Sequence, residues 1–427
     1  MVMNSIDIMS PVGSFEALAA AIKAGASSIY FGVAGMDMRA GSSASFKLTD
    51  LKKIVDICRK NNVRSYLCVN TIVYDEEMKM VRKICDAAKK FKVSAVIASD
   101  VAVMQYCRKI GIEVHISTQV NVSNLEAVKF YSKFADVIVL ARELNLKQIK
   151  NICQEIKKQK ICGPSGELVK IEIFVHGALC VSISGKCYMS LATYGLSANK
   201  GKCLQNCRRS YRVIDEETGD ELVIDNKCVM SPKDLCTIGI IDKILDAGVS
   251  VLKIEGRGRS ADYVYIVTKV YHEAVEAFFN ESYDDKKVDA WIKELESVFN
   301  RGFWHGGYYL GKKLGEWSGV YGSRSTKEKI KIGSVKHYFP KAKVGEFIIQ
   351  SDELSIGDEI MVIGKVTGIV LSKVESIFLS KNDSPVKSAK KGDLITIPMD
   401  EKIRENDDLY LVIPRKKFQV NHKIINQ

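Results

Sequence analysis

The sequence has no apolar run that approaches the roughly 18–20 residues needed to span a bilayer, and its start lacks a basic segment. No lysine or arginine precedes Lys23, so the basic region of a secretory signal is absent. We therefore expect a cytoplasmic protein, in which thiols stay reduced and the 12 cysteines do not form a disulfide framework. With 427 residues, 46% hydrophobic content and only 7 prolines, the chain can bury a large core and form two domains.

Acidic residues are in deficit, most clearly in one stretch. The chain carries 63 lysines and arginines against 51 acids, a net charge of +12 and a pI near 9.0. This favours a polyanionic partner such as nucleic acid, although a basic surface can also serve only solubility. From Ile173 to Ile214 there is no acid at all. The bases of this stretch that we consider candidates for RNA phosphate are Lys200, Lys202, Arg208 and Arg209.

Several motifs of other enzyme classes are missing. No Gly-x-Gly-x-x-Gly follows the first predicted strand, which argues against a dinucleotide-binding sheet. No Gly-x-Ser-x-Gly elbow is present. The segment from His272 to Glu276 falls one ligand short of the His-Glu-x-x-His zinc motif, and an exposed helix face explains it.

An alternation of short β-branched runs with amphipathic segments extends from residue 5 to about 260. It predicts parallel strands joined by crossover helices. The spacing of about 20–25 residues per early unit fits a (β/α)8 barrel of the TIM type better than an open sheet. The eight predicted strands are 6–12, 27–33, 63–70, 95–100, 113–120, 136–141, 170–177 and 250–256.

The pattern changes near the C-terminus. Short alternating strands with Gly-Asp turns at Gly357-Asp358 and Gly392-Asp393 predict a small all-β barrel. We expect a catalytic barrel domain over residues 1–311, a linker over 312–328 and the β-barrel over 329–427.

In such a barrel the chemistry lies where the strands end. One loop there is far longer than the others, the insertion at 178–237 after strand seven, and long loops at this face are usually functional. The polar residues that follow predicted strands are Arg39, Asn70, Asp100, Gln119, Arg142, His176 and Glu255.

Half of the cysteines gather in this insertion. Chance enrichment of buried thiols is the alternative to a metal site, and it is the simplest reading of scattered cysteines such as Cys58, Cys85 and Cys107. The intervals between the clustered ones, six, fifteen, three, twenty and seven residues, differ from the tight pairs of zinc sites and suit an iron–sulfur cluster. The clustered cysteines are Cys180, Cys187, Cys203, Cys207, Cys228 and Cys236.

Segments 172–180 (EIFVHGALC) and 185–190 (GKCYMS) resemble the signature of the collagenase-like peptidase family U32. Further matches are 32–46, 117–124, 203–208, 231–236, 253–257 and 300–311. The members that this chain resembles most are oxygen-independent hydroxylases with a [4Fe–4S] cluster. One branch makes 5-hydroxyuridine at the tRNA wobble position, with prephenate as the hydroxyl source, and its appended domain is similar to the C-terminal one here. Another hydroxylates a ribosomal cytidine, and a short branch serves ubiquinone synthesis.

The resemblance implies a ligand set of Cys180, Cys187, Cys203 and Cys236. Cys207 is an alternative to either of the last two, and Cys228 is an extra.

A small dicarboxylate needs a cationic clamp, for which Arg39, Lys253 and Arg257 are candidates unless they pair with Glu255 or Glu172. We assign substrate binding to Arg39, Gln119 and Arg257. The candidate catalytic residues are His176, Glu255 and Lys253. His176 could equally be a structural histidine, and Asp234 is a second possible base.

The sequence thus predicts an RNA hydroxylase that binds tRNA and a small anionic donor. A peptidase, as the family name states, and a non-catalytic RNA-binding scaffold with a structural cluster stay open as alternatives.

Overall fold

The computed structural model describes residues 6–33, 35–39, 46–183, 185–209, 211–222, 230–314, 316–320 and 322–415. The chain forms two compact units, one of residues 1–295 and 299–324 and the other of residues 296–298 and 325–427. The division after Arg324 lies inside the segment 312–328.

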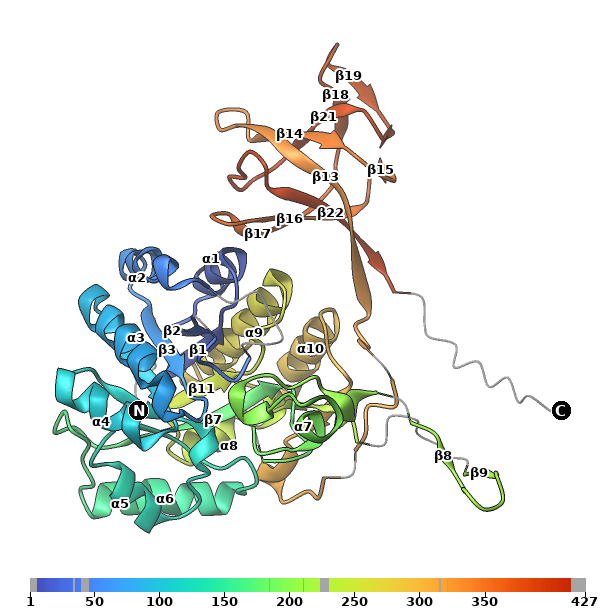
Figure 1. Cartoon of the computed structure of the whole chain (residues 1–427). Coiled ribbons are helices and arrows are strands. Elements are labelled where there is room, and N and C mark those ends of the chain that lie inside the picture. Colours follow the sequence, from blue (N-terminus) through green and yellow to red (C-terminus); the bar gives the residue numbers. More distant parts are fainter. Residues whose placement is uncertain are drawn as a thin grey trace. The chain divides into compact units, whose positions relative to one another are not determined.

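The first unit is a closed barrel of eight parallel strands, as the sequence predicts (Figure 1). Each strand pairs with the next, and β11 closes the ring by pairing with both β7 and β1. The strands are β1 (Asp7–Pro11), β2 (Ser28–Gly32), β3 (Arg64–Val69), β4 (Ala95–Ala98), β5 (Val114–Ile116), β6 (Val137–Val139), β7 (Lys170–Gly177) and β11 (Val251–Ile254).

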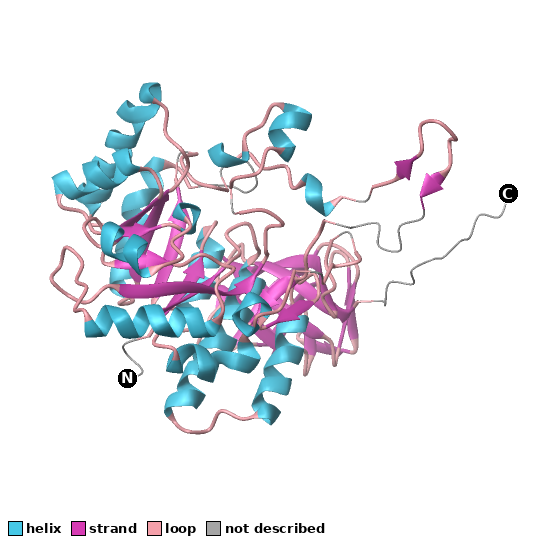
Figure 2. Ribbon diagram, turned by 90° about the horizontal axis from the view of Figure 1, so that it is seen from below, coloured by secondary structure: helices cyan, strands magenta, loops and turns pink. Residues whose placement is uncertain are grey.

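Helices cover the outside of the barrel (Figure 2). Their apolar residues recur at three- and four-residue spacing, so that one face is buried, as Leu51, Ile54, Val55 and Cys58 are in α2. The helices are α1 (Phe15–Lys23), α2 (Leu51–Lys60), α3 (Met78–Phe91), α4 (Val101–Ile110), α5 (Leu125–Tyr131), α6 (Leu146–Lys158), α8 (Ile241–Asp246), α9 (Ala261–Phe279) and α10 (Asp285–Glu296).

Large side chains fill the interior of the barrel. Met9, Tyr30, Tyr66, Ile97 and other buried residues form one cluster across the strands. The barrel is therefore a packed core, and the room for a ligand lies beyond the carboxyl ends of its strands.

The insertion after β7 contains the short helix α7 (Met189–Tyr194) and a hairpin of β8 (Val213–Ile214) and β9 (Glu221–Leu222), which projects from the body of the unit (Figures 1 and 2). It returns as β10 (Asp234–Cys236), which pairs antiparallel with the end of β7 and parallel with β12 (Phe303–His305). Cys228 lies outside the described residues.

The second unit is all-β, as predicted, and its main sheet is antiparallel. Hydrogen-bonded neighbours follow the order β17-β16-β22-β13-β14-β21-β18-β19, and β15 pairs with β20. Both predicted turns are present, with Gly357 and Gly392 at positive φ. The strands are β13 (Lys327–Phe339), β14 (Val344–Ile349), β15 (Glu353–Ser355), β16 (Glu359–Gly364), β17 (Gly368–Lys373), β18 (Ile377–Leu379), β19 (Ser384–Val386), β20 (Ser388–Lys390), β21 (Leu394–Pro398) and β22 (Asp408–Pro414).

Among the described residues, no helix combines the length and the apolar character needed to cross a bilayer.

Candidate functional site

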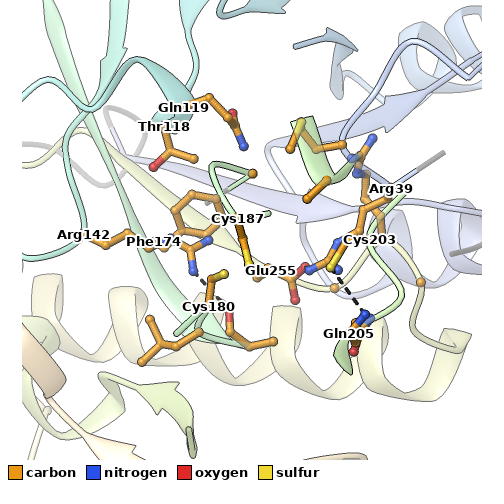
Figure 3. Close-up of a pocket in the computed structure, with 18 of the residues that line it drawn as sticks. Arg39, Thr118, Gln119, Arg142, Phe174, Cys180, Cys187, Cys203, Gln205 and Glu255 are labelled. Carbon is orange, nitrogen blue, oxygen red and sulfur yellow. Dashed lines mark hydrogen bonds and ion pairs between the residues drawn. The ribbon is translucent and has the colours of Figure 1, made fainter. Parts of the chain in front are cut away.

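A cavity of about 310 Å³ lies where the barrel strands end, under the insertion (Figure 3). Strand ends supply one wall, and the insertion supplies the other. The residues that carry its chemistry are Arg39, Asn70, Ser117, Gln119, Arg142, Cys180, Cys187, Cys203, Cys207, Arg208, Lys253, Glu255, Arg257, Arg259 and Arg301.

Four cysteines of the insertion line this cavity, and each is only partly buried. They are Cys180, Cys187, Cys203 and Cys207. Burial raises the pKa of the Cys207 thiol, while the neighbouring Arg208 lowers it. In the described part of the chain, no three His, Cys, Asp or Glu side chains are grouped as ligands of one metal ion. The four thiols therefore line the cavity without forming a compact single-ion site.

The structure does not bring Cys236 into this group. Cys236 is the last residue of β10, where it is fully buried and pairs with His176 of β7. It does not line the cavity, whereas Cys207 does. Of the ligand set that the resemblance implies, three cysteines meet at the cavity, and the structure offers Cys207 in place of the fourth.

Arg208 holds the cysteine-bearing segment in place. Its guanidinium donates to the carbonyl oxygen of Leu179, to the Ser231 hydroxyl at 3.0 Å and to the Pro232 carbonyl at 2.7 Å. Three segments of the insertion are thereby joined at one side chain. These contacts assign Arg208 a structural role, which differs from the RNA contact expected from the sequence.

The three cations predicted to clamp a dicarboxylate are each paired with a carboxylate. Lys253 Nζ lies 2.6 Å from Glu172 Oε1, and both side chains are buried. Arg257 Nη1 lies 2.6 Å from Asp37 Oδ1, again with both side chains buried. Buried ion pairs resist separation because each charge loses its compensation. Lys253 and Arg257 therefore form structural ion pairs, as the alternative to a dicarboxylate clamp predicted.

The third predicted cation, Arg39, forms an ion pair with Glu255 at 2.5 Å. Burial raises the pKa of Glu255, but Arg39, Arg259 and Arg142 outweigh it and lower the pKa to about 2. A general base works best with a pKa near the operating pH. The carboxylate of Glu255 is therefore poorly suited to the catalytic role expected of it and instead compensates the surrounding cations.

Two further arginines at the cavity, Arg142 and Arg259, form no ion pair with a carboxylate of the described residues. The Arg142 guanidinium lies 3.8 Å from the ring centre of Phe174, donates to the Ala178 carbonyl, and leaves its buried Nε without a hydrogen-bond partner. The Arg259 guanidinium lies 3.5 Å from the ring centre of Phe299. Burial lowers the pKa of both arginines, as expected for cations that lack full compensation.

Sequence reasoning named Arg142 only as a strand end and missed Arg259. The signal for both was present, because Arg142 follows strand six and Arg259 follows Arg257 in the segment GRGRS after strand eight.

Amides and hydroxyls form a polar wall opposite the cysteines. The Asn70 Nδ2 group donates to the Ser117 hydroxyl at 3.0 Å and to Gln119 Oε1 at 3.1 Å. Ser117 also donates to Gln119. Gln119 thus lies at the cavity as predicted, and its carbonyl oxygen accepts both of these hydrogen bonds.

His176 lies behind the cavity and does not line it. Its ring is buried among Tyr263, Tyr271 and Phe303. Burial lowers its pKa to about 3, against a smaller opposite effect of Glu255. A neutral, enclosed imidazole fits the structural alternative rather than proton donation.

The remaining predicted acids also serve structure. Asp234 of β10 receives the backbone N–H of Arg301 at 3.2 Å. Asp100 caps α4 and receives the Ala102 N–H at 2.9 Å. Neither lines the cavity.

Of the other three basic residues predicted to contact RNA, one forms an ion pair and two are exposed. Lys200 pairs with Glu77 at 2.5 Å and donates to the Ile72 carbonyl. Lys202 and Arg209 are exposed. They are the two of the four predicted RNA contacts that remain directed to solvent.

The fold and the site together define the class of protein: a (β/α)8 barrel whose catalytic face carries a cavity lined by cysteines and arginines. The family model of peptidase family U32 matches residues 13–319. This chain belongs to peptidase family U32.

Relatives that cover most of the chain carry different names. A protein of Porphyromonas gingivalis named Collagenase is 53% identical over 410 residues, which are 96% of this chain and 98% of that protein. An uncharacterized protease of Methanocaldococcus jannaschii is 40% identical over 414 residues, 96% of this chain and 99% of that protein. The tRNA hydroxylation protein P of Helicobacter pylori is 33% identical over 322 residues, 71% of this chain and 72% of that protein.

Proposed function

We propose that this chain is an RNA hydroxylase that forms 5-hydroxyuridine at the wobble position of tRNA in the cytoplasm, using an iron–sulfur cluster and a small anionic hydroxyl donor. The observation that carries the proposal is the meeting of four partly buried cysteines with two partly compensated arginines, Arg142 and Arg259, in one cavity at the barrel face. The name of the Helicobacter pylori relative supports the RNA substrate.

The donor set fits a cluster better than a single ion. The thiolate ligands of an iron–sulfur cluster bind to several iron atoms, so the cysteines are spread around the cluster rather than gathered at one point. Cys180, Cys187, Cys203 and Cys207 line the same cavity, and Arg208 compensates the charge that thiolates bring. We assign the cluster, a [4Fe–4S] centre by family resemblance, to these four. When bound, it would supply redox chemistry at the cavity.

The arginines without carboxylate partners suit the small donor. A carboxylate that enters the cavity would meet Arg142 and Arg259, whose charges are only partly compensated by Glu255. Guanidinium groups bind carboxylates through two parallel hydrogen bonds. Prephenate, the donor that the family resemblance suggests, carries two such groups. We therefore propose Arg142 and Arg259 as the donor-binding residues, in place of the paired Lys253 and Arg257.

A uridine must leave its stack to enter the cavity. This costs least in a single-stranded loop such as the anticodon loop. The side-chain amides of Asn70 and Gln119 would meet the polar edge of the base at the wall opposite the cysteines. The chain's own part is to hold base and donor together and to exclude water.

Proteolysis is the alternative that the names of the more similar relatives favour. A hydrolytic nucleophile needs an adjacent base. Among the described residues, no histidine lines the cavity, and the one acid there, Glu255, is held by Arg39. His272 and Glu276 lie on α9, away from the cavity, with 3.7 Å between their side chains. The site therefore favours the hydroxylase.

The test is mass spectrometry of tRNA and ribosomal RNA nucleosides from cells with and without the gene, grown with and without oxygen. We expect loss of 5-hydroxyuridine and its derivatives from tRNA in both conditions. The wild-type gene and Cys58→Ala should restore them, because Cys58 is buried in α2 far along the chain from the insertion. Cys187→Ala should not. Normal hydroxyuridine in the deletion strain, together with cleavage of denatured collagen by the purified protein, would establish the peptidase instead.

A further inference from the structure

The outer side of the cysteine-bearing segment carries an unusual surface of exposed apolar side chains. Most large apolar residues of the first unit are buried, yet five in this one segment are exposed. We call them the rim patch: Ile183 (44% exposed), Tyr188 (73%), Leu191 (40%), Tyr194 (46%) and Leu204 (38%). Contiguous exposed apolar residues mark interaction sites more often than isolated ones do.

The rim patch adjoins the cavity through the chain itself. Tyr188 stands between Cys187 and Met189, which both line the cavity. Leu204 likewise stands between Cys203 and Gln205, which also line it. The same loops therefore present one set of side chains inward and the rim patch outward.

Three residues of the patch belong to α7 and its N-terminus. Tyr188 is the N-cap of α7, and Leu191 and Tyr194 follow at three-residue spacing, which brings side chains to neighbouring positions on a helix surface. Tyr188 is 73% exposed, so most of its ring is accessible to solvent. Arg209 lies beside Tyr194, with its guanidinium 5.2 Å from the ring centre.

The charges that the patch-bearing segment itself contributes are all of one sign. No acid occurs between Ile173 and Ile214. Lys186, Lys202 and Arg209 are exposed among the patch residues. RNA matches both features of this surface, because it offers phosphates to the cations and flat bases to the rings.

We infer that the rim patch is a stacking platform for unpaired RNA nucleotides, on which the bases that flank the reacting nucleotide rest while that nucleotide enters the cavity. Tyr188 is the principal stacking residue, and Tyr194 with Arg209 is the second. Single-strand binding proteins combine rings and cations in this way. The inference rests on the proposed function for the identity of the reacting base, but the binding it describes can be measured without any reaction.

The experiment measures binding of the purified full-length protein to a labelled anticodon stem–loop RNA and to a fully paired RNA of equal length, at several salt concentrations. Tyr188→Ala should weaken binding to the stem–loop about tenfold, and Tyr188→Phe should retain it, because stacking needs the ring and not the hydroxyl. Binding to the paired RNA should be unchanged in both. Phe130→Ala, which removes an exposed ring from α5, should have no effect on either RNA.

Salt dependence separates stacking from charge. Lys202→Ala should lower the slope of log affinity against log salt by about one, whereas Tyr188→Ala should leave the slope unchanged. Iron content of each variant, after purification without oxygen, shows whether a substitution beside Cys187 has disturbed the cysteines rather than the surface. Tyr194→Ala, more distant from any cavity cysteine in sequence, provides a second variant with the same expectation.

Three results would overturn the inference. One is stem–loop binding by Tyr188→Ala and Tyr194→Ala within twofold of wild type. Another is an equal loss on the paired RNA. The third is concentration-dependent dimerisation of the wild type that Tyr188→Ala abolishes, since the patch would then contact a second copy. If stacking is measured but the deletion strain keeps its hydroxyuridine, the proposed reaction fails while this surface stands. If hydroxyuridine is lost from the deletion strain but Tyr188→Ala binds RNA as the wild type does, the proposed reaction stands and the stacking surface fails.

Discussion

Arg39 and Glu255, 216 residues apart in the chain, form an ion pair at the mouth of the barrel, with Nη2 2.5 Å from Oε1. Arg39 follows β2 and Glu255 follows β11. Glu255 is surrounded by more positive charge than it can balance, since Arg142 and Arg259 also lower its pKa. The pair therefore leaves a net positive cavity, which is what an anionic substrate requires.

Replacing Glu255 tests this balance. The pKa of Glu255 is lowered from 4.5 to about 2, so the folded state binds its proton more weakly than the unfolded state does. The resulting stabilisation is complete above pH 4.5 and is lost as the pH falls toward 2. We expect Glu255→Gln to lower the free energy of unfolding by about 3 kcal/mol at pH 7, and by progressively less below pH 4.5.

Urea denaturation of both proteins across this pH range provides the measurement. Glu126→Gln is the matched control, because its ion pair with Lys129 is exposed, and we expect a change of less than about 0.5 kcal/mol. Equal stability of wild type and Glu255→Gln at pH 7 would contradict the proposed charge balance.

A second stability prediction concerns His176, whose pKa is lowered by burial rather than by neighbouring charges. Its pKa is lowered from 6.5 to about 3 by burial, so the unfolded state takes up a proton that the folded state refuses. Stability is therefore complete above pH 6.5 and falls as the pH drops toward 3. His176→Phe, which keeps a ring among Tyr263, Tyr271 and Phe303, should remove part of this acid sensitivity.

Thermal unfolding of wild type and His176→Phe is compared at pH 7.5 and pH 5. These two values lie on either side of about 6.5, the ordinary pKa of histidine. Wild type should lose more stability between the two than the variant. If His176 instead titrates near neutrality as a proton donor, the hydroxylation rate of wild type should follow that titration. We expect no such dependence.

The barrel could be predicted from the sequence because each of its eight strands is a short β-branched run next to an amphipathic helix. It did not reveal β10, whose three residues carry no alternation of their own and become a strand only by pairing with Gly177 and His176 of β7. Because of that pairing, Cys236 lies within the sheet and does not line the cavity. The choice between Cys207 and Cys236 therefore depends on a tertiary contact that spacing along the chain does not encode.

The charged residues show the same limit. The sequence predicted that Arg39, Lys253 and Arg257 lie at the barrel mouth, and all three line the cavity there. Which cations are compensated depends on side-chain pairing between strands, such as Lys253 with Glu172. Periodicity predicts on which face a residue lies, but not the partner that it finds.

The cysteine assignment can be tested directly. Protein purified without oxygen should be brown, absorb broadly near about 400 nm and contain about four iron and four sulfide per chain. Cys207→Ala should abolish the colour and the iron. Cys236→Ala should keep both, at a cost of about 1 kcal/mol of stability for a small buried side chain.

Iron and sulfide analysis with absorption spectra decides between the two variants. Loss of the cluster in Cys236→Ala with retention in Cys207→Ala would restore the ligand set that the family resemblance implies. Zinc as the only stoichiometric metal would refute an iron–sulfur cluster altogether.

The last prediction concerns the donor. Arg142 and Arg259 lie against Phe174 and Phe299 rather than against carboxylates, so each can accept an anion without breaking an existing ion pair. Arg142→Gln and Arg259→Gln should therefore raise the donor concentration needed for half-maximal hydroxylation by roughly tenfold or more, the effect of one charged hydrogen bond of about 1.5–3 kcal/mol. The affinity for tRNA should change little, because RNA phosphates remain outside the cavity. Arg59→Gln, an exposed arginine at the end of α2, is the control and should alter neither quantity. Hydroxylation at varied donor concentration, together with tRNA binding in the absence of donor, separates the two effects. Equal losses in donor use and tRNA affinity would assign these arginines to the RNA, and an unchanged donor requirement in both variants would place the donor elsewhere.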